Sequence, residues 1–142
     1  MTSDDNRRVV ERFDALFGKA DLRELDELCT PDMVNHALAA HMPKGLAGTR
    51  KFLEGQAHSF TSDGWAQVTV IAERDYVVQH GIRSGRWKGG PLFGFELRAG
   101  EYSRECVFIY RLENGRIAER WAVRDDMAMI RQLGGLPSAP KP

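Results

Sequence analysis

The sequence predicts an α+β protein in which a curved, mostly antiparallel (mixed) β-sheet wraps around N-terminal helices. Two observations predict this class. Residues 3–57 read mainly as helices with apolar stripes, whereas residues 65–125 read as strands joined by tight turns. Helices followed by a run of strands are typical of α+β proteins. A sheet that curves around helices leaves a hydrophobic pocket on its concave side, where ligands commonly bind.

Capping residues and apolar spacing mark three helices in the first part of the chain. The first covers residues 3–18 and can be capped by Ser3 or Asp4. Asp21 can cap a shorter second helix, and a third is expected over residues 45–57. Each presents leucine, valine or phenylalanine at helical spacing, so we expect one face of each helix to pack against the sheet.

Strands follow, separated by turn residues. Arg74-Asp75 forms one tight turn, and Glu113-Asn114-Gly115 predicts a hairpin because asparagine and glycine accept a positive φ. A last short helix begins at Asp125 or Asp126. The predicted strands cover residues 33–36, 65–73, 76–88, 102–112 and 116–125.

Length and composition indicate one domain, expected over residues 1–135, with a disordered tail over residues 136–142. The 142 residues can bury a sizeable core. Lysine plus arginine equals aspartate plus glutamate at 20 each, so no net field favours nucleic acid or an anionic membrane as a partner. No apolar run approaches the roughly 20 residues that span a bilayer.

The cysteines and the N-terminal residues favour a cytoplasmic location. Cys29 and Cys106 lack metal or redox spacing, and a reducing compartment suits them. Residues 1–6 are polar and acidic, unlike a secretory signal. The histidines and carboxylates fall at no recognised metal-ligand spacing, and we find no phosphate-binding glycine loop and no nucleophile elbow. We therefore expect neither a metal nor a cofactor.

The last strand carries the clearest chemical signal, because alternation gives it two unlike faces. A carboxylate among apolar neighbours loses hydration, which raises its pKa and suits it to proton transfer. We therefore expect Asp125 to face the pocket as a general acid/base, with the adjacent Asp126 capping the last helix; the alternative is that Asp125 itself is the cap. The face expected in the pocket holds Ile117, Glu119, Trp121, Val123 and Asp125, and the opposite face holds Arg116, Ala118, Arg120, Ala122 and Arg124.

Further candidates surround this carboxylate. Trp121 can form a flat pocket wall, and alternation sends one of Asn35 and His36 inward. Glu119 is either a pocket residue or the structural partner of an arginine or histidine. His80 can line the pocket from the strand over residues 76–88. Two aromatic residues that alternate with the small core residue Cys106 complete the candidate substrate contacts, Phe108 and Tyr110.

Four segments, in order, carry a resemblance to a known family. They are residues 31–36 (Pro-Asp-Met-Val-Asn-His), 45–48 (Gly-Leu-Ala-Gly), 114–125 and 131–134 (Arg-Gln-Leu-Gly). Over roughly residues 7–135 the chain resembles the SnoaL-like polyketide cyclases of the cone-shaped nuclear-transport-factor-like superfamily. The resemblance implies a cone with a hydrophobic pocket, and it implies a reaction that needs no cofactor.

The same resemblance implies roles for individual residues. In these cyclases an aspartate near the end of the last strand removes a proton next to carbonyl groups and allows aldol-type ring closure; Asp125 matches that position, with His36 as a second catalytic candidate. The cyclases also carry a histidine on the strand before the Asn-Gly turn. Residues 104–110 contain none, so Tyr110, His80 or His36 would have to bind the enolate oxygen.

Two other functions stay open. The first is a hydrolase or isomerase that acts on a small apolar substrate. Epoxide hydrolysis in the superfamily uses an Asp-Arg-Asp arrangement around a water; Arg83 could supply the cation, but no Asp-x-Arg or Arg-x-Asp unit lies on the strand over residues 76–88. The second is a non-catalytic module for small-molecule binding or dimerisation, which the fold also supports.

The family usually forms dimers, so we expect a homodimer. The expected contact is the face of the last strand with small Ala118 and Ala122, flanked by Arg116, Arg120 and Arg124. Acidic partners such as Glu105 of the second copy would neutralise these arginines.

Overall fold

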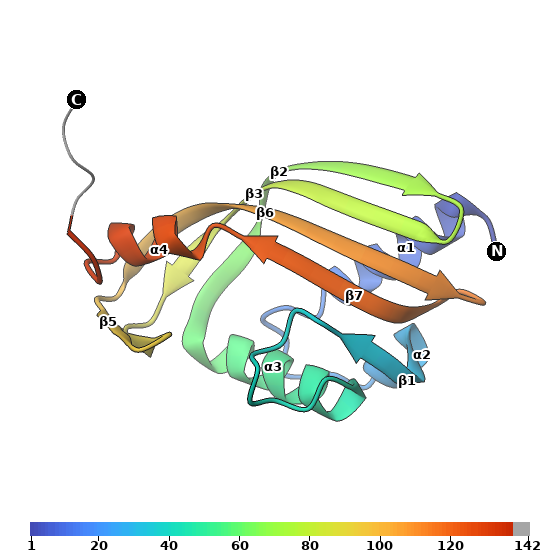
Figure 1. Ribbon diagram of the computed structural model, residues 1–142, viewed down its shortest axis with the longest axis horizontal. Helices are drawn as coiled ribbons and strands as arrows, with labels where there is room; N and C mark the ends of the chain where they lie inside the picture. Colours follow the sequence, from blue (N-terminus) through green and yellow to red (C-terminus); the bar gives the residue numbers. More distant parts are fainter. Residues whose placement is uncertain (138–142) are drawn as a thin grey trace.

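A five-stranded mixed sheet forms the body of the protein in the computed structural model, which describes residues 1–137 (Figure 1). The strand order is β1-β7-β6-β3-β2. β1 pairs with β7 in parallel, and the other neighbours are antiparallel. This confirms the predicted α+β class with a curved, unclosed sheet. The strands are β1 (Cys29–Asn35), β2 (Phe60–Glu73), β3 (Tyr76–Trp87), β6 (Gly100–Glu113) and β7 (Arg116–Arg124).

Helices α1 (Ser3–Asp14), α2 (Leu25–Leu28) and α3 (Leu46–Ser59) precede most of the sheet, and α4 (Asp126–Gln132) follows it. The first helix is capped by Thr2 rather than by Ser3 or Asp4. Its hydroxyl accepts from the Asp5 N–H, and the Asp5 carboxylate accepts from the Thr2 N–H, both at 3.0 Å. This capping box satisfies two backbone N–H donors at the start of the helix, so α1 begins at Ser3, directly after its cap Thr2.

A small hairpin stands where the sequence suggested only a glycine- and proline-rich link. Strands β4 (Gly90–Leu92) and β5 (Phe95–Leu97) pair around Phe93 and Gly94, which both have positive φ. Figure 1 shows this hairpin beside α4, at the end of the sheet away from the N-terminus.

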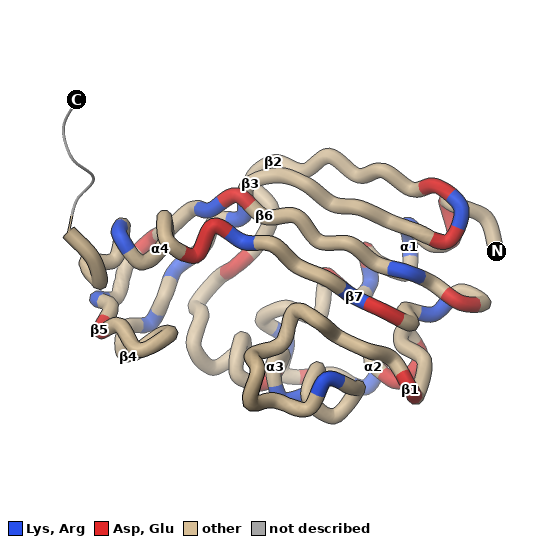
Figure 2. The backbone as a smooth tube through the Cα atoms, viewed as in Figure 1, with Lys and Arg blue, Asp and Glu red and all other residues tan. Residues whose placement is uncertain are grey.

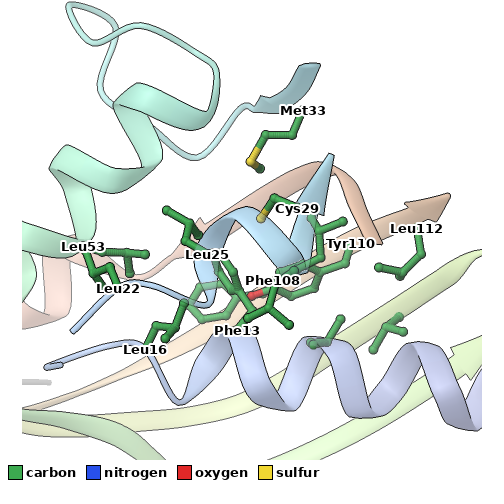
Figure 3. Packing of buried hydrophobic residues seen from close by; sticks show 14 of the residues in the cluster. Phe13, Leu16, Leu22, Leu25, Cys29, Met33, Leu53, Phe108, Tyr110 and Leu112 are labelled. Carbon is green, nitrogen blue, oxygen red and sulfur yellow. The ribbon is translucent and has the colours of Figure 1, made fainter. Parts of the chain in front are cut away.

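The main core lies between the helices and the inner face of the sheet. Phe13 of α1 packs edge-to-face on Tyr110 of β6, with ring centroids 5.8 Å apart. Figure 3 shows these rings together with Phe108, surrounded by leucines from the helical half. Cys29 and Cys106 are both buried in this cluster, which confirms Cys106 as a core residue.

A second core forms between the sheet and α4, and Leu136 packs partly buried against it. Leu136 was expected to begin the disordered tail; residues 138–142 of that expected tail lie outside the described residues. The buried members of this second core are Trp87, Leu97, Tyr102, Met129, Ile130 and Leu133.

A β-bulge in β7 decides which side chains of this strand face inward. Leu112 pairs with Ile117 and Arg111 pairs with Glu119, so Ala118 is an extra residue in the ladder. Ile117 and Ala118 are therefore both buried. A one-residue shift moves every later side chain to the other face.

The prediction for the two faces of the last strand is wrong for this reason. Beyond the bulge, Arg120, Ala122 and Arg124 point toward the interior, whereas Val123 is 69% exposed on the outer face. Because Ala118 and Arg120 are buried and Ala122 packs on the main core, this face is not free for the dimer contact expected from the sequence.

Two glycines let β2 bend closely over β3. A Cβ added at Gly81 would lie 1.9 Å from the Gln67 carbonyl oxygen, and one at Gly85 would lie 2.0 Å from that of Ser62. No helix among residues 1–137 is both long and apolar enough to cross a bilayer.

Candidate functional site

A cavity of about 300 Å³ lies between the inner face of the sheet, α3 and the hairpin. Its volume is at the lower end of the range for small-molecule sites. The lining residues are Phe17, Ala37, Leu38, Ala39, Met42, Phe52, Gln56, Phe60, Asp63, Arg83, Leu92, Phe93, Arg104, Phe108 and Arg124.

The lining divides into an apolar part and a polar part. Phe17 and Phe52 stack edge-to-face at 5.9 Å between centroids, and Phe108 of β6 faces the cavity. The loop over residues 37–42 and the tip of the hairpin add further apolar atoms. Aromatic and aliphatic surfaces of this kind bind the flat, apolar body of a ligand.

Asp63 of β2 is the centre of the polar part. Its Oδ2 accepts hydrogen bonds from Arg83 Nη2 at 2.8 Å, Arg83 Nε at 3.2 Å and Gln56 Nε2 at 3.1 Å. Its Oδ1 accepts one from the Tyr102 hydroxyl. Among the described residues, Oδ1 accepts only this one bond, whereas Oδ2 accepts three, so Oδ1 is the oxygen with accepting capacity left for a ligand.

Arg83 of β3 links this carboxylate to the N-terminal helix. Its Nη1 lies 3.0 Å from Asp14 Oδ1, and its guanidinium carbon lies 4.8 Å from the Trp65 ring centroid. The Arg83 side chain is only 2% exposed. Burial raises the pKa of Asp14, and the nearby Arg83 opposes that shift.

Tyr102 is held in its neutral form. Burial raises the pKa of its hydroxyl, and the negative charge of Asp63 raises it further. The hydroxyl therefore stays a hydrogen-bond donor to Asp63 across the physiological pH range.

Two more arginines face the cavity from β6 and β7. Arg104 Nη1 lies 2.6 Å from Asp126 Oδ1, and Arg124 Nε lies 3.6 Å from the same oxygen. Burial lowers the pKa of Arg124; Asp126 opposes that shift, and the positive charges of Arg104 and Arg120 add to it. An arginine nonetheless stays protonated in proteins.

The expected catalytic residue, Asp125, does not lie in this cavity. Its side chain is exposed, and its Oδ1 accepts from the Ala128 N–H at 3.1 Å, so it is the N-cap of α4. The alternative interpretation of Asp125 as a cap therefore fits the structure. Asp126 instead pairs with Arg104.

His36, Glu119 and Trp121 come together, but on the outer face of the sheet. His36 Nε2 lies 2.6 Å from Glu119 Oε2, and the His36 ring stacks on Trp121 at 5.2 Å between centroids. Glu119 also accepts from Arg111 Nε at 3.1 Å. The hydrogen bond from His36 is the main cause that lowers the pKa of Glu119. Glu119 thus has the structural pairing that the sequence left open as an alternative.

Asn35 and His80 also lie outside the cavity lining. The Asn35 amide is fully buried and donates to Thr49 Oγ1 at 3.0 Å, while its oxygen accepts from the Ala37 N–H at 3.1 Å. His80 lies on the outer face, 2.8 Å from Glu105 Oε2.

Of the expected substrate contacts, Phe108 lines the cavity. Tyr110 is fully buried behind it, where its hydroxyl accepts from Arg120 Nε at 3.1 Å.

Sequence reasoning did not identify Asp63, and it considered Arg83 only as the cation of an epoxide hydrolase. The strand was expected to begin at residue 65, whereas β2 begins at Phe60, so Asp63 lay outside the expected strand. Arg83 shares a face with buried Val77 and Gln79, and that alternation was the available signal. An arginine at such a position looks like a solvent-exposed one until its carboxylate partners are known.

The curved sheet, with helices and a cavity on its inner face, defines an α+β protein of the cone type. A model of the SnoaL-like polyketide cyclase family matches residues 7–133, so the chain belongs to this family.

Solved structures agree with the fold. TsrD from Streptomyces laurentii is 25% identical, with a TM-score of 0.81 over 96% of this chain and 99% of that one. AclR from Streptomyces galilaeus, a proposed hydroxylase, is 20% identical, with a TM-score of 0.75 over 99% of this chain and 87% of that one. IdmH from Streptomyces antibioticus, a proposed polyketide cyclase, is 22% identical, with a TM-score of 0.72 over 91% and 98%. No curated protein sequence matches the chain.

Proposed function

We propose that the protein is a cofactor-independent enzyme of the cyclase type that acts on a hydrophobic carbonyl compound, with Asp63 as the general acid/base. One observation carries the proposal: among the described residues that line the cavity, Asp63 is the only acidic one. Asp63 lines the same cavity as the aromatic rings, so a bound ketone would meet a carboxylate that its hydrogen bonds hold in place. Membership of the family supports chemistry of this type.

The proposed reaction begins with proton transfer. The free lone pair of Asp63 Oδ1 takes a proton from the carbon next to a carbonyl group, and the electron pair of that C–H bond forms an enolate. The enolate carbon attacks a second carbonyl carbon of the same molecule and forms a carbon–carbon bond. Asp63 then returns its proton to the alkoxide, so no atom or electron is gained or lost.

Proton transfer can be tested without knowing the substrate. The probe is 2-acetylnaphthalene, a bicyclic methyl ketone whose methyl protons exchange for deuterium through the enolate. Exchange in D2O is followed by proton NMR with wild type, Asp63→Asn and Asp125→Asn. We expect wild type to accelerate exchange and Asp63→Asn to lose about 10²-fold or more of that acceleration, the range for one general base.

Asp125→Asn is the matched control, because Asp125 is exposed and outside the cavity. It should exchange as wild type does. Thermal unfolding followed by circular dichroism shows whether each variant is folded at the assay temperature. If folded Asp63→Asn accelerates exchange at the wild-type rate, Asp63 is not the base. Loss of exchange in Asp125→Asn alone would instead support Asp125 as the base, as the sequence predicted.

A non-catalytic binding module is the second candidate function. The observation in its favour is that the Asp63 side chain is 4% exposed and already accepts from three residues. In that case wild type would bind the ketone, detected as a thermal shift, with no acceleration of exchange.

We also propose a homodimer that forms through the outer face of the sheet. Val123 on β7 is 69% exposed and Ile71 on β2 is 60% exposed, so this face carries apolar surface that no described element covers at these positions. Light scattering should give about twice the chain mass of 16.0 kDa, and Val123→Glu should shift the mass toward one chain. A wild-type monomer would contradict the dimer.

A further inference from the structure

Arginines outnumber carboxylates around the cavity. Arg83 of β3 lies opposite Arg104 of β6 in the sheet. Arg124 of β7 lies opposite Cys106, the next inward residue of β6. Arg120 lies behind the aromatic wall, with its guanidinium carbon 4.6 Å from the Phe108 ring centroid. Three carboxylates pair with these arginines or lie beside them, namely Asp14, Asp63 and Asp126.

The carboxylates do not satisfy all of these cations. Arg83 is held by two of them, whereas Arg104 and Arg124 share the single Asp126. Asp126 is 2.6 Å from Arg104 but 3.6 Å from Arg124, beyond ordinary hydrogen-bond length. Figure 2 shows positive and negative stretches next to each other where β7 enters α4.

One buried donor without a partner lies at this end of the cavity. Among the described residues that line the cavity, Arg104 Nε is buried with no hydrogen bond. The Arg104 side chain lines the cavity and is 8% exposed. A buried guanidinium nitrogen without an acceptor costs free energy, and a bound anion would remove that cost.

We propose that the ligand of this cavity carries a carboxylate, which Arg124 and Arg104 bind at the β6–β7 end while its apolar ring system lies against Phe17, Phe52 and Phe108. The guanidinium fork of arginine matches a carboxylate with two parallel hydrogen bonds. The inference rests on the proposed function, because it names the substrate class of the same cavity: an aromatic or polycyclic keto acid rather than a neutral ketone or ester.

The test compares two ligands of the same shape. 2-Naphthoate carries a carboxylate, and 2-naphthamide replaces it with a neutral amide. Binding of each is measured by isothermal titration calorimetry at neutral pH to wild type, Arg124→Gln and Arg116→Gln. Arg116 is an exposed arginine at the other end of β7, so its substitution removes the same charge away from the cavity.

We expect wild type to bind the acid at least about tenfold more tightly than the amide. Arg124→Gln should weaken acid binding by about tenfold to a hundredfold, the effect of losing one charge-assisted hydrogen bond, and leave amide binding within about threefold. Arg116→Gln should retain the preference for the acid.

Equal affinity for acid and amide, binding of neither ligand, or the same loss in both variants would overturn the proposal. These results are independent of proton exchange. If the protein accelerates exchange of the neutral ketone but does not prefer the acid, the enzyme proposal stands and the carboxylate-binding proposal is rejected. If it prefers the acid but does not accelerate exchange, the carboxylate-binding proposal stands and the enzyme proposal is rejected.

Discussion

Arg83 and Asp63 form an ion pair directly at the cavity wall, with Nη2 and Oδ2 2.8 Å apart and both side chains at most 4% exposed. A second contact, from Arg83 Nε at 3.2 Å, reaches the same oxygen. Because Arg83 also binds Asp14 at the end of α1, one guanidinium couples the helical layer, β2 and β3. The orientation of the proposed catalytic carboxylate therefore depends on the docking of α1.

Arg83→Met should destabilise the protein strongly. It leaves the charges of Asp14 and Asp63 buried without their shared cation, which costs about 3–5 kcal/mol in unfolding free energy. Urea unfolding followed by circular dichroism measures the change. The control is Arg86→Met on the same strand, an exposed position where the change should stay within about 0.5 kcal/mol. Equal stability of the two variants would contradict a structural role for the ion pair.

Gly81→Ala and Gly55→Ala should have opposite signs. At Gly81 the new methyl group would meet backbone of β2, including the Gln67 carbonyl oxygen at 1.9 Å, so the strands must separate; we expect a loss of about 1–3 kcal/mol, as for overpacking. At Gly55 in α3 nothing lies within 4 Å, and alanine should stabilise the helix by about 0.5–1 kcal/mol. Chemical denaturation of both variants tests the pair, and a neutral Gly81→Ala would show that β2 does not lie so close in solution.

Tyr102 should ionise only well into the alkaline range. Burial, followed by the charge of Asp63, raises its pKa above the ordinary value of 10.0. A folded-state pKa above the unfolded one favours folding below pH 10.0, and this stability is lost as the pH rises through the folded value. The ultraviolet absorbance of tyrosinate in wild type minus Tyr102→Phe should therefore show no step near pH 10.0 while the protein is native. A step at that pH would mean that the hydroxyl is solvated.

His36→Ala should raise the pKa of Glu119 toward 4.5, because the hydrogen bond from His36 is the main cause that holds it lower. A depressed carboxylate pKa stabilises the fold above the unfolded value, and that contribution disappears as the pH falls through the folded value. Carbonyl NMR of Glu119 across an acid titration measures both midpoints. Arg111 still contacts Glu119 in the variant, so a partial rise is expected. An unchanged midpoint would show that the surface pair is open in solution.

The order and type of the main elements could be predicted from the sequence because they depend on local patterns: apolar spacing in the helices and the Asn114-Gly115 turn. The side chains of β7 that face inward could not be predicted in this way. Strict alternation from buried Ile117 puts Asp125 inside, and the extra residue Ala118 reverses everything beyond it. A bulge depends on how two strands pair, and nothing in β7 alone reveals it.

The candidate site was harder to predict for a second reason. Asp63 and Arg83 are separated by 20 positions and brought together by the pairing of β2 with β3. Buried ion pairs use the same residue types as exposed ones, so only the three-dimensional arrangement distinguishes them. Phe108 lines the cavity, and β6 keeps the regular alternation of buried residues from which such a position can be read in the sequence.

The cavity walls differ in how they can change over evolution. Its charged residues stand on long strands, where an insertion would disrupt the ladder of hydrogen bonds. Much of its apolar surface comes from the loop over residues 37–42 and from the hairpin around Phe93, neither of which belongs to the five-stranded sheet. Length changes in these two segments would alter the size of molecule that the cavity can hold, while the proposed acid–base and anion-binding groups would stay in register. A library aimed at new substrates should therefore vary these segments and hold the strands constant.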